Sequence, residues 1–139
     1  MQIDNIHRVH IQWEEEESTI LSILLTASGQ VNRMGDGTGD PASAGVFMGT
    51  TEEPLFEEWI SLLDEELMEM AGRYEFPDPM GTKCKLTIAL EGNDESTGFE
   101  FVYGIDSLGP PEEIMELVHA AVDLTESWWD SKRFKRKRS

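Results

Sequence analysis

Apolar and polar residues alternate in the first part of the chain with the period of a β-strand. Residues 8–13 alternate strictly, and residues 19–27 are rich in β-branched and aliphatic side chains. Strict alternation is typical of a strand with one buried face, and β-branched enrichment favours a central strand. We therefore predict two strands here, followed by a turn at residues 28–30 and a short third strand over residues 31–34.

The middle of the chain changes from a glycine-rich loop to a helical period. Residues 35–45 hold four of the twelve glycines and are predicted to form a surface loop, with residues 46–48 as an edge strand. Thr50 and Glu53 have the spacing of a capping box, so we predict a helix that starts there and continues until the prolines at 77 and 79 end it. Its apolar stripe is Phe56, Trp59, Ile60, Leu63, Leu67, Met70 and Tyr74.

The last third of the chain predicts a hairpin and a second helix. Residues 83–91 and 99–105 alternate again around a glycine-flanked polar stretch, which indicates two antiparallel strands. Pro110 and Pro111, followed by two glutamates, favour a helix start. We expect this helix to end near Trp129. Its inner stripe is Ile114, Leu117, Val118, Ala121, Val122, Thr125 and Trp129.

These elements predict an α+β fold with the order β-β-(β)-α-β-β-α. Hairpin connections imply an antiparallel sheet of four to six strands, and the single apolar stripe on each helix places both helices on one face. The element order is similar to that of secretion-chaperone-like α+β proteins, although the chain lacks their N-terminal helix. The other sheet face is expected to be mildly basic, with Arg8, His10, Gln12, Lys83, Lys85 and Thr87.

The charge distribution favours a cationic partner. The 139 residues include 28 Asp or Glu and 11 Lys or Arg, and the net charge is −17. We predict one acidic domain over residues 1–131, which hold every carboxylate, and a basic, disordered tail over residues 132–139. Such a body repels membranes and nucleic acid, so nucleic acid would be bound only through residues 132–138, which could instead fold back onto the acidic surface.

Few residues carry a catalytic or metal-binding signature. The glycines at 37 and 39 resemble a dinucleotide fingerprint, but no helix start follows them directly, and Asn32, Asp36 and Asp40 lack the spacing of a calcium loop. Glu116 and His119 form one Glu-x-x-His unit without the second unit that a di-metal site needs. We therefore predict no catalytic residue, metal or cofactor.

The single cysteine is assigned to the core rather than to chemistry. Cys84 lies on the apolar parity of its strand, so we expect a buried and unreactive thiol. One cysteine cannot form an internal disulfide, and the N-terminus lacks a signal sequence. We therefore expect a cytoplasmic location.

Two functions are compatible with the sequence. The first is a non-catalytic interaction module that binds a basic protein as an inhibitor, immunity factor or chaperone. In size and charge the chain is similar to many bacterial immunity proteins, which neutralise basic toxin domains. The alternative is a small enzyme or ligand-binding domain with its site at residues 35–45. For the first function, the candidate partner-binding residues are Glu57, Glu58, Asp64, Glu65, Glu69 and Trp128.

Overall fold

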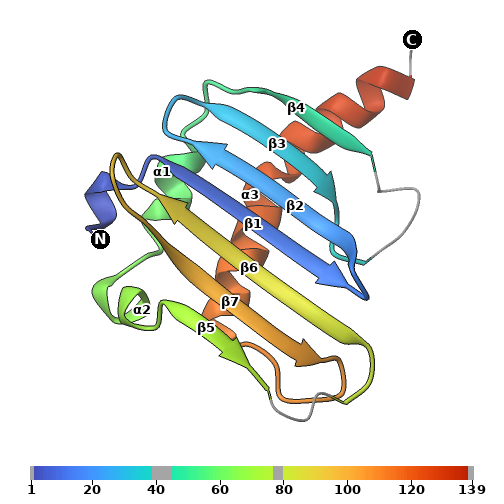
Figure 1. Cartoon of the computed structure of the whole chain (residues 1–139). Coiled ribbons are helices and arrows are strands. Elements are labelled where there is room, and N and C mark those ends of the chain that lie inside the picture. Colours follow the sequence, from blue (N-terminus) through green and yellow to red (C-terminus); the bar gives the residue numbers. More distant parts are fainter. Residues whose placement is uncertain (1, 39–44, 77–79, 138–139) are drawn as a thin grey trace.

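The computed structural model describes residues 2–38, 45–76 and 80–137, with side chains up to Lys132. Within these residues, seven strands form one sheet in the order β4-β3-β2-β1-β6-β7-β5 (Figure 1). All neighbouring strands are antiparallel except β5 and β7, which run parallel. The strands are β1 (Arg8–Glu15), β2 (Ser18–Thr26), β3 (Gln30–Gly35), β4 (Val46–Thr50), β5 (Gly72–Glu75), β6 (Lys83–Glu91) and β7 (Ser96–Gly104).

The long C-terminal helix covers one face of this sheet. Helix α3 (Glu112–Lys137) crosses behind the strands in Figure 1, and the short α1 (Leu55–Ile60) lies on the same side. A second short helix, α2 (Glu65–Glu69), lies near the β5 edge, and a single 3-10 turn (Ile3–Asn5) precedes β1. The α+β class is therefore confirmed, whereas the sheet has more strands than the predicted four to six and is mixed rather than antiparallel.

The hydrophobic core lies between the sheet and helices α1 and α3. The predicted parity is correct for β1 and β6, because Val9, Ile11 and the alternate residues of β6 are buried. Ile105, predicted on the apolar parity of the next strand, instead lies after the end of β7 and is 55% exposed. Trp59 is fully buried, and its indole Nε1 donates a hydrogen bond to the Leu117 carbonyl at 2.9 Å, which joins α1 to α3. From α3 the core receives Ile114, Leu117, Val118, Ala121 and Trp129.

The single helix predicted between Thr50 and Tyr74 is wrong. Helix α1 ends at Ile60, α2 begins at Glu65, and Tyr74 belongs to β5. The interruption has a local cause: the Asp64 carboxylate accepts a hydrogen bond from the Leu67 N–H at 2.8 Å, and so caps a new helix. Asp favours such caps because its short side chain satisfies an N–H that has no partner within the helix.

The predicted capping box at Thr50 and Glu53 is also wrong. Pro54 occupies the N-cap position of α1 and makes no side-chain capping bond. The Glu53 N–H instead donates to the Thr51 hydroxyl at 3.1 Å, in the turn that leads into the helix.

Helix α3 continues past its predicted end near Trp129 and reaches Lys137. Lys and Arg are good helix formers, and cations near a helix C-terminus interact favourably with the helix dipole. The basic residues therefore extend the helix that carries them.

Candidate functional site

A groove lined by apolar side chains and carboxylates lies between α2 and the N-terminal half of α3. Its volume is about 570 Å³. Leu62, one of its lining residues, is 45% exposed. The groove is lined by Leu62, Asp64, Glu66, Leu67, Met70, Glu113, Glu116, Leu117 and Ala120. Its lining contains four carboxylates and no cation.

The α2–α3 groove follows from the local sequence on each side. The Asp64 cap starts α2, so that Leu67 and Met70, three residues apart, come to lie along the groove. On α3, Glu113 and Glu116 have the same spacing and add carboxylates from the opposite wall. The result is a surface that combines exposed apolar area with concentrated negative charge.

The predicted acidic residues are all exposed, but they do not form one surface. Glu57 and Glu58 lie on α1, and only Asp64 lines the groove. Glu65 and Glu69 line a different hollow of about 620 Å³, together with Asp4 and the N-terminal turn. The break between α1 and α2 separates Glu57 and Glu58 from the rest, and different sides of α2 separate Asp64 from Glu65 and Glu69.

Three of the four groove carboxylates, Glu66, Glu113 and Glu116, were not among the predicted partner-binding residues. The signal available for Glu113 and Glu116 was their spacing on the last helix. That spacing does not say which other element lies opposite. The pairing of α2 with α3 depends on the fold and is not visible in either segment alone.

Trp128 lies at the other end of α3, away from the groove. It is half-buried against β4, where its Nε1 donates to the Thr50 carbonyl at 3.3 Å. A Cβ added at Gly49 would be 3.1 Å from the Trp128 ring, so glycine permits this close packing. The Lys132 ammonium is 5.6 Å from the centre of the same ring. The structure does not bring Trp128 together with the predicted acidic residues.

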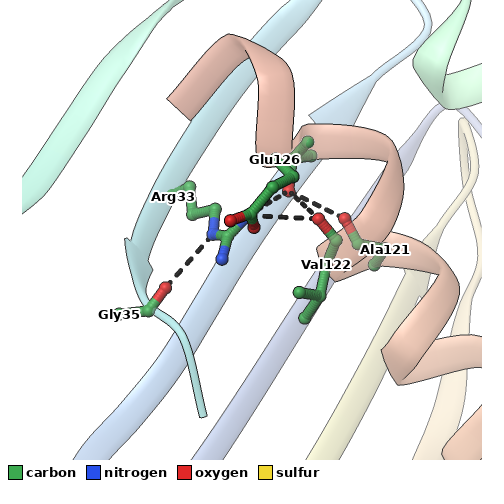
Figure 2. Close-up of polar contacts among 6 residues, drawn as sticks. Arg33, Gly35, Ala121, Val122 and Glu126 are labelled. Carbon is green, nitrogen blue, oxygen red and sulfur yellow. Dashed lines mark hydrogen bonds and ion pairs between the residues drawn. The ribbon is translucent and has the colours of Figure 1, made fainter. Parts of the chain in front are cut away.

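A buried arginine beneath α3 was not predicted (Figure 2). Arg33 on β3 is fully buried, and its Nη1 donates to the Val122 carbonyl, the Thr125 hydroxyl and, at 2.8 Å, the Glu126 carboxylate. Its guanidinium carbon lies 3.9 Å from the centre of the Trp129 ring. These contacts fix the C-terminal half of α3 to β3. They are internal to the fold, so we assign Arg33 a structural role.

The open face of the sheet is not the mildly basic surface that was expected. Arg8 pairs with Glu91 at 3.6 Å. Lys85 pairs with Glu100 at 3.4 Å, and Arg73 approaches the same carboxylate at 2.7 Å. Cross-strand carboxylates therefore compensate the cations on this face.

One polar contact on the open face involves a histidine and a serine. His10 Nε2 lies 3.0 Å from the Ser22 hydroxyl, across the β1–β2 pair. Burial lowers the pKa of His10, and the nearby Arg8 lowers it further, against an opposing effect of Glu91. A nucleophilic serine would also need donors for an oxyanion, but the strand backbone here is committed to the sheet. We therefore interpret the contact as a cross-strand hydrogen bond.

Within residues 2–38, 45–76 and 80–132, the remaining chemical candidates do not assemble a site. Cys84 is buried, as predicted, and burial raises the pKa of its thiol. Asp36 accepts hydrogen bonds from the N–H and hydroxyl of Thr38, while Asp40 and most of the glycine fingerprint lie outside the described residues. Across the described ranges, no three His, Cys, Asp or Glu side chains gather in a metal-binding arrangement.

No protein-family model, curated protein or solved structure matches this chain. Among the helices of the described residues, none has the length and apolar character needed to cross a lipid bilayer.

Proposed function

We propose that this protein is a non-catalytic interaction module that binds a basic protein partner in the α2–α3 groove. The observation that supports this most directly is the lining of the groove, in which apolar side chains are combined with the carboxylates of Asp64, Glu66, Glu113 and Glu116. A surface of this kind complements a segment that carries one bulky apolar side chain between Lys or Arg residues. The biological role would be that of an inhibitor, an immunity factor or a chaperone.

The two features of the groove would contribute differently to binding. The apolar anchor of the partner would bury Leu62 and its neighbours, which supplies affinity. The carboxylates would accelerate the encounter and select cationic segments, because complementary charge acts mainly on association rate and specificity. The net charge of −17 adds a long-range field of the same sign. A cytoplasmic location remains part of the proposal, since a single cysteine suits a reducing compartment.

A peptide titration tests the proposal. The probes are a labelled peptide with one Phe flanked by Lys and Arg, the same peptide with Ala in place of Phe, and a version with Glu in place of the cations. We expect the first to bind tightest and the acidic version not to bind. Binding should weaken from 0.1 M to 1 M salt, where the screening length falls from about 10 Å to about 3 Å.

Two substitutions in the groove and one outside it test where the peptide binds. Glu116→Gln and Leu62→Ala should each weaken the binding of the Phe peptide, the former by about two- to fivefold. Glu58→Gln removes the same charge from α1, outside the groove, and serves as the matched control. Equal affinities for Glu116→Gln and Glu58→Gln would show that net charge, rather than the groove, attracts the peptide.

A further inference from the structure

The chain itself contains a segment with the chemistry that the groove complements. Residues 132–138, the basic segment, consist of six Lys or Arg residues around one aromatic side chain, Phe134. Every carboxylate of the protein precedes this segment in the sequence. The chain therefore carries an acidic groove and a matching basic segment in separate places.

The basic segment is too far from the groove of its own copy. Glu116 lines the groove, and Phe134 follows 18 positions later on the same helix, α3. A rise of 1.5 Å per residue separates these positions by about 27 Å. In Figure 1 the C-terminal end of α3 extends beyond β4, whereas α2 lies at the opposite edge of the sheet, near β5. A continuous helix cannot fold back over this distance, so the segment can reach only the groove of another molecule.

We infer that the basic segment of one copy docks into the α2–α3 groove of a second copy. This inference rests on the proposed function, because it assigns an occupant to the same groove. Phe134 would contact the apolar lining residues of the groove, and the surrounding cations would lie against Asp64, Glu66, Glu113 and Glu116. Each copy donates a segment at one end of α3 and accepts one at the other.

The arrangement has two consequences for assembly. Two copies can exchange their segments reciprocally in a closed two-fold dimer, or the docking can repeat head to tail in rings or open chains. Two bodies that each carry −17 also repel one another, which makes the association weak and reversible. A basic partner would compete with the basic segment for the groove, so partner binding would dissolve the assembly.

Two complementary variants of the full chain test this inference. The groove variant carries Glu113→Lys and Glu116→Lys and keeps its basic segment. The segment variant carries Gln at Arg133, Lys135, Arg136, Lys137 and Arg138 and keeps its groove. Lys132 is left unchanged in it because this residue lies beside Trp128. Circular dichroism and the thermal midpoint establish that both variants fold.

Sedimentation velocity at low salt gives the decisive readout. We expect wild type to form concentration-dependent oligomers, and each variant alone to remain monomeric. A mixture of the two should form a 1:1 dimer and nothing larger, because it contains only one functional segment and one functional groove. Phe134→Ala, which keeps every charge, should weaken wild-type association. Glu57→Lys with Glu58→Lys, a charge reversal in the first turn of α1, should leave oligomers in place.

The contrary outcomes are distinct. A monomeric wild type at all concentrations would overturn the inference, and so would wild-type oligomers combined with a mixture that stays monomeric. A synthetic peptide of residues 131–139 separates the inference from the proposed function. If this peptide binds the groove while the copies do not associate, only the inference fails. If neither this peptide nor the Phe-containing basic probe binds, both proposals fail.

Discussion

Arg33 and Glu126 form an ion pair of 2.8 Å in which the guanidinium is fully buried while the carboxylate side chain is 47% exposed. The pair joins β3 to α3 across 93 positions of sequence. A buried cation is costly unless its hydrogen bonds are made, and Glu126 supplies the compensating charge from the solvent side.

Removing the Glu126 carboxylate should therefore destabilise the protein more than removing a half-exposed side chain usually does. Glu126→Ala is expected to lower the free energy of unfolding by about 1.5–3 kcal/mol, the range for a hydrogen bond to a charged group. Glu91→Ala is the control, because its side chain is similarly exposed, at 43%, but its partner Arg8 is exposed as well. That variant should lose less than about 1 kcal/mol. Urea unfolding measures both, and equal losses would contradict a special role for the buried cation.

Two substitutions at Asp64 distinguish the effect of its capping hydrogen bond from the effect of its negative charge. Asp64→Ala should lower stability by about 1 kcal/mol, because the Leu67 N–H loses its acceptor. Asp64→Asn keeps a capping oxygen and should be close to wild type in thermal unfolding, yet it removes one carboxylate from the groove. We therefore expect the Asn variant to bind the basic probe peptide more weakly than wild type. A stable Ala variant would refute the capping explanation for the break between α1 and α2.

Cys84 should react slowly with a thiol reagent in the native protein and rapidly after denaturation. Burial raises the pKa of its thiol, and Glu15 and Glu16 raise it further, so the reactive thiolate is disfavoured. A pKa that is higher in the folded state stabilises the fold below the ordinary value of 9.0, and this contribution is lost as pH rises through the folded-state pKa. The unfolding midpoint should decline in this alkaline range. Fast labelling of the native protein would contradict the burial of β6.

Protonation of His10 should lower the stability of the folded protein as the solution becomes acidic. Its pKa is lowered in the folded state, so protonation favours the unfolded chain as pH falls below the ordinary value of 6.5. Between pH 7.5 and 5 the urea midpoint should fall less for His10→Gln than for wild type. His119→Gln, which changes an exposed residue on α3, should follow wild type. If His10→Gln declines as steeply as wild type, carboxylates alone cause the acid sensitivity.

Patterns confined to one segment predicted the fold well. Strand β6 occupies residues 83–91 as expected, and its parity placed Cys84 in the core. The failures involve residues whose partners are distant in sequence. The sequence placed Tyr74 on the apolar stripe of a helix. In the structure Tyr74 belongs to β5, which pairs with β7, and its ring stacks on Phe101 with 5.0 Å between the ring centres.

The candidate site was only partly predictable for the same reason. Composition indicated an acidic surface, and Asp64 was identified correctly as exposed. The groove requires α2 to lie opposite α3, and an apolar stripe does not encode which helix will be its neighbour. Arg33 shows the limit most clearly, because a charge at a core position of β3 makes sense only once Val122, Thr125 and Glu126 are in place.

The distance along the chain between Arg33 and α3 also bears on biosynthesis. Val122, whose carbonyl accepts a hydrogen bond from Arg33, follows Arg33 by 89 positions in the sequence. At ordinary translation rates the ribosome needs roughly 5–20 s to add that many residues. During this interval the first strands have emerged with an apolar face uncovered and a cation that lacks its acceptors. Folding of these strands is therefore completed only after α3 has been synthesised, and chains truncated before Glu126 are expected to be clients of chaperones and proteases.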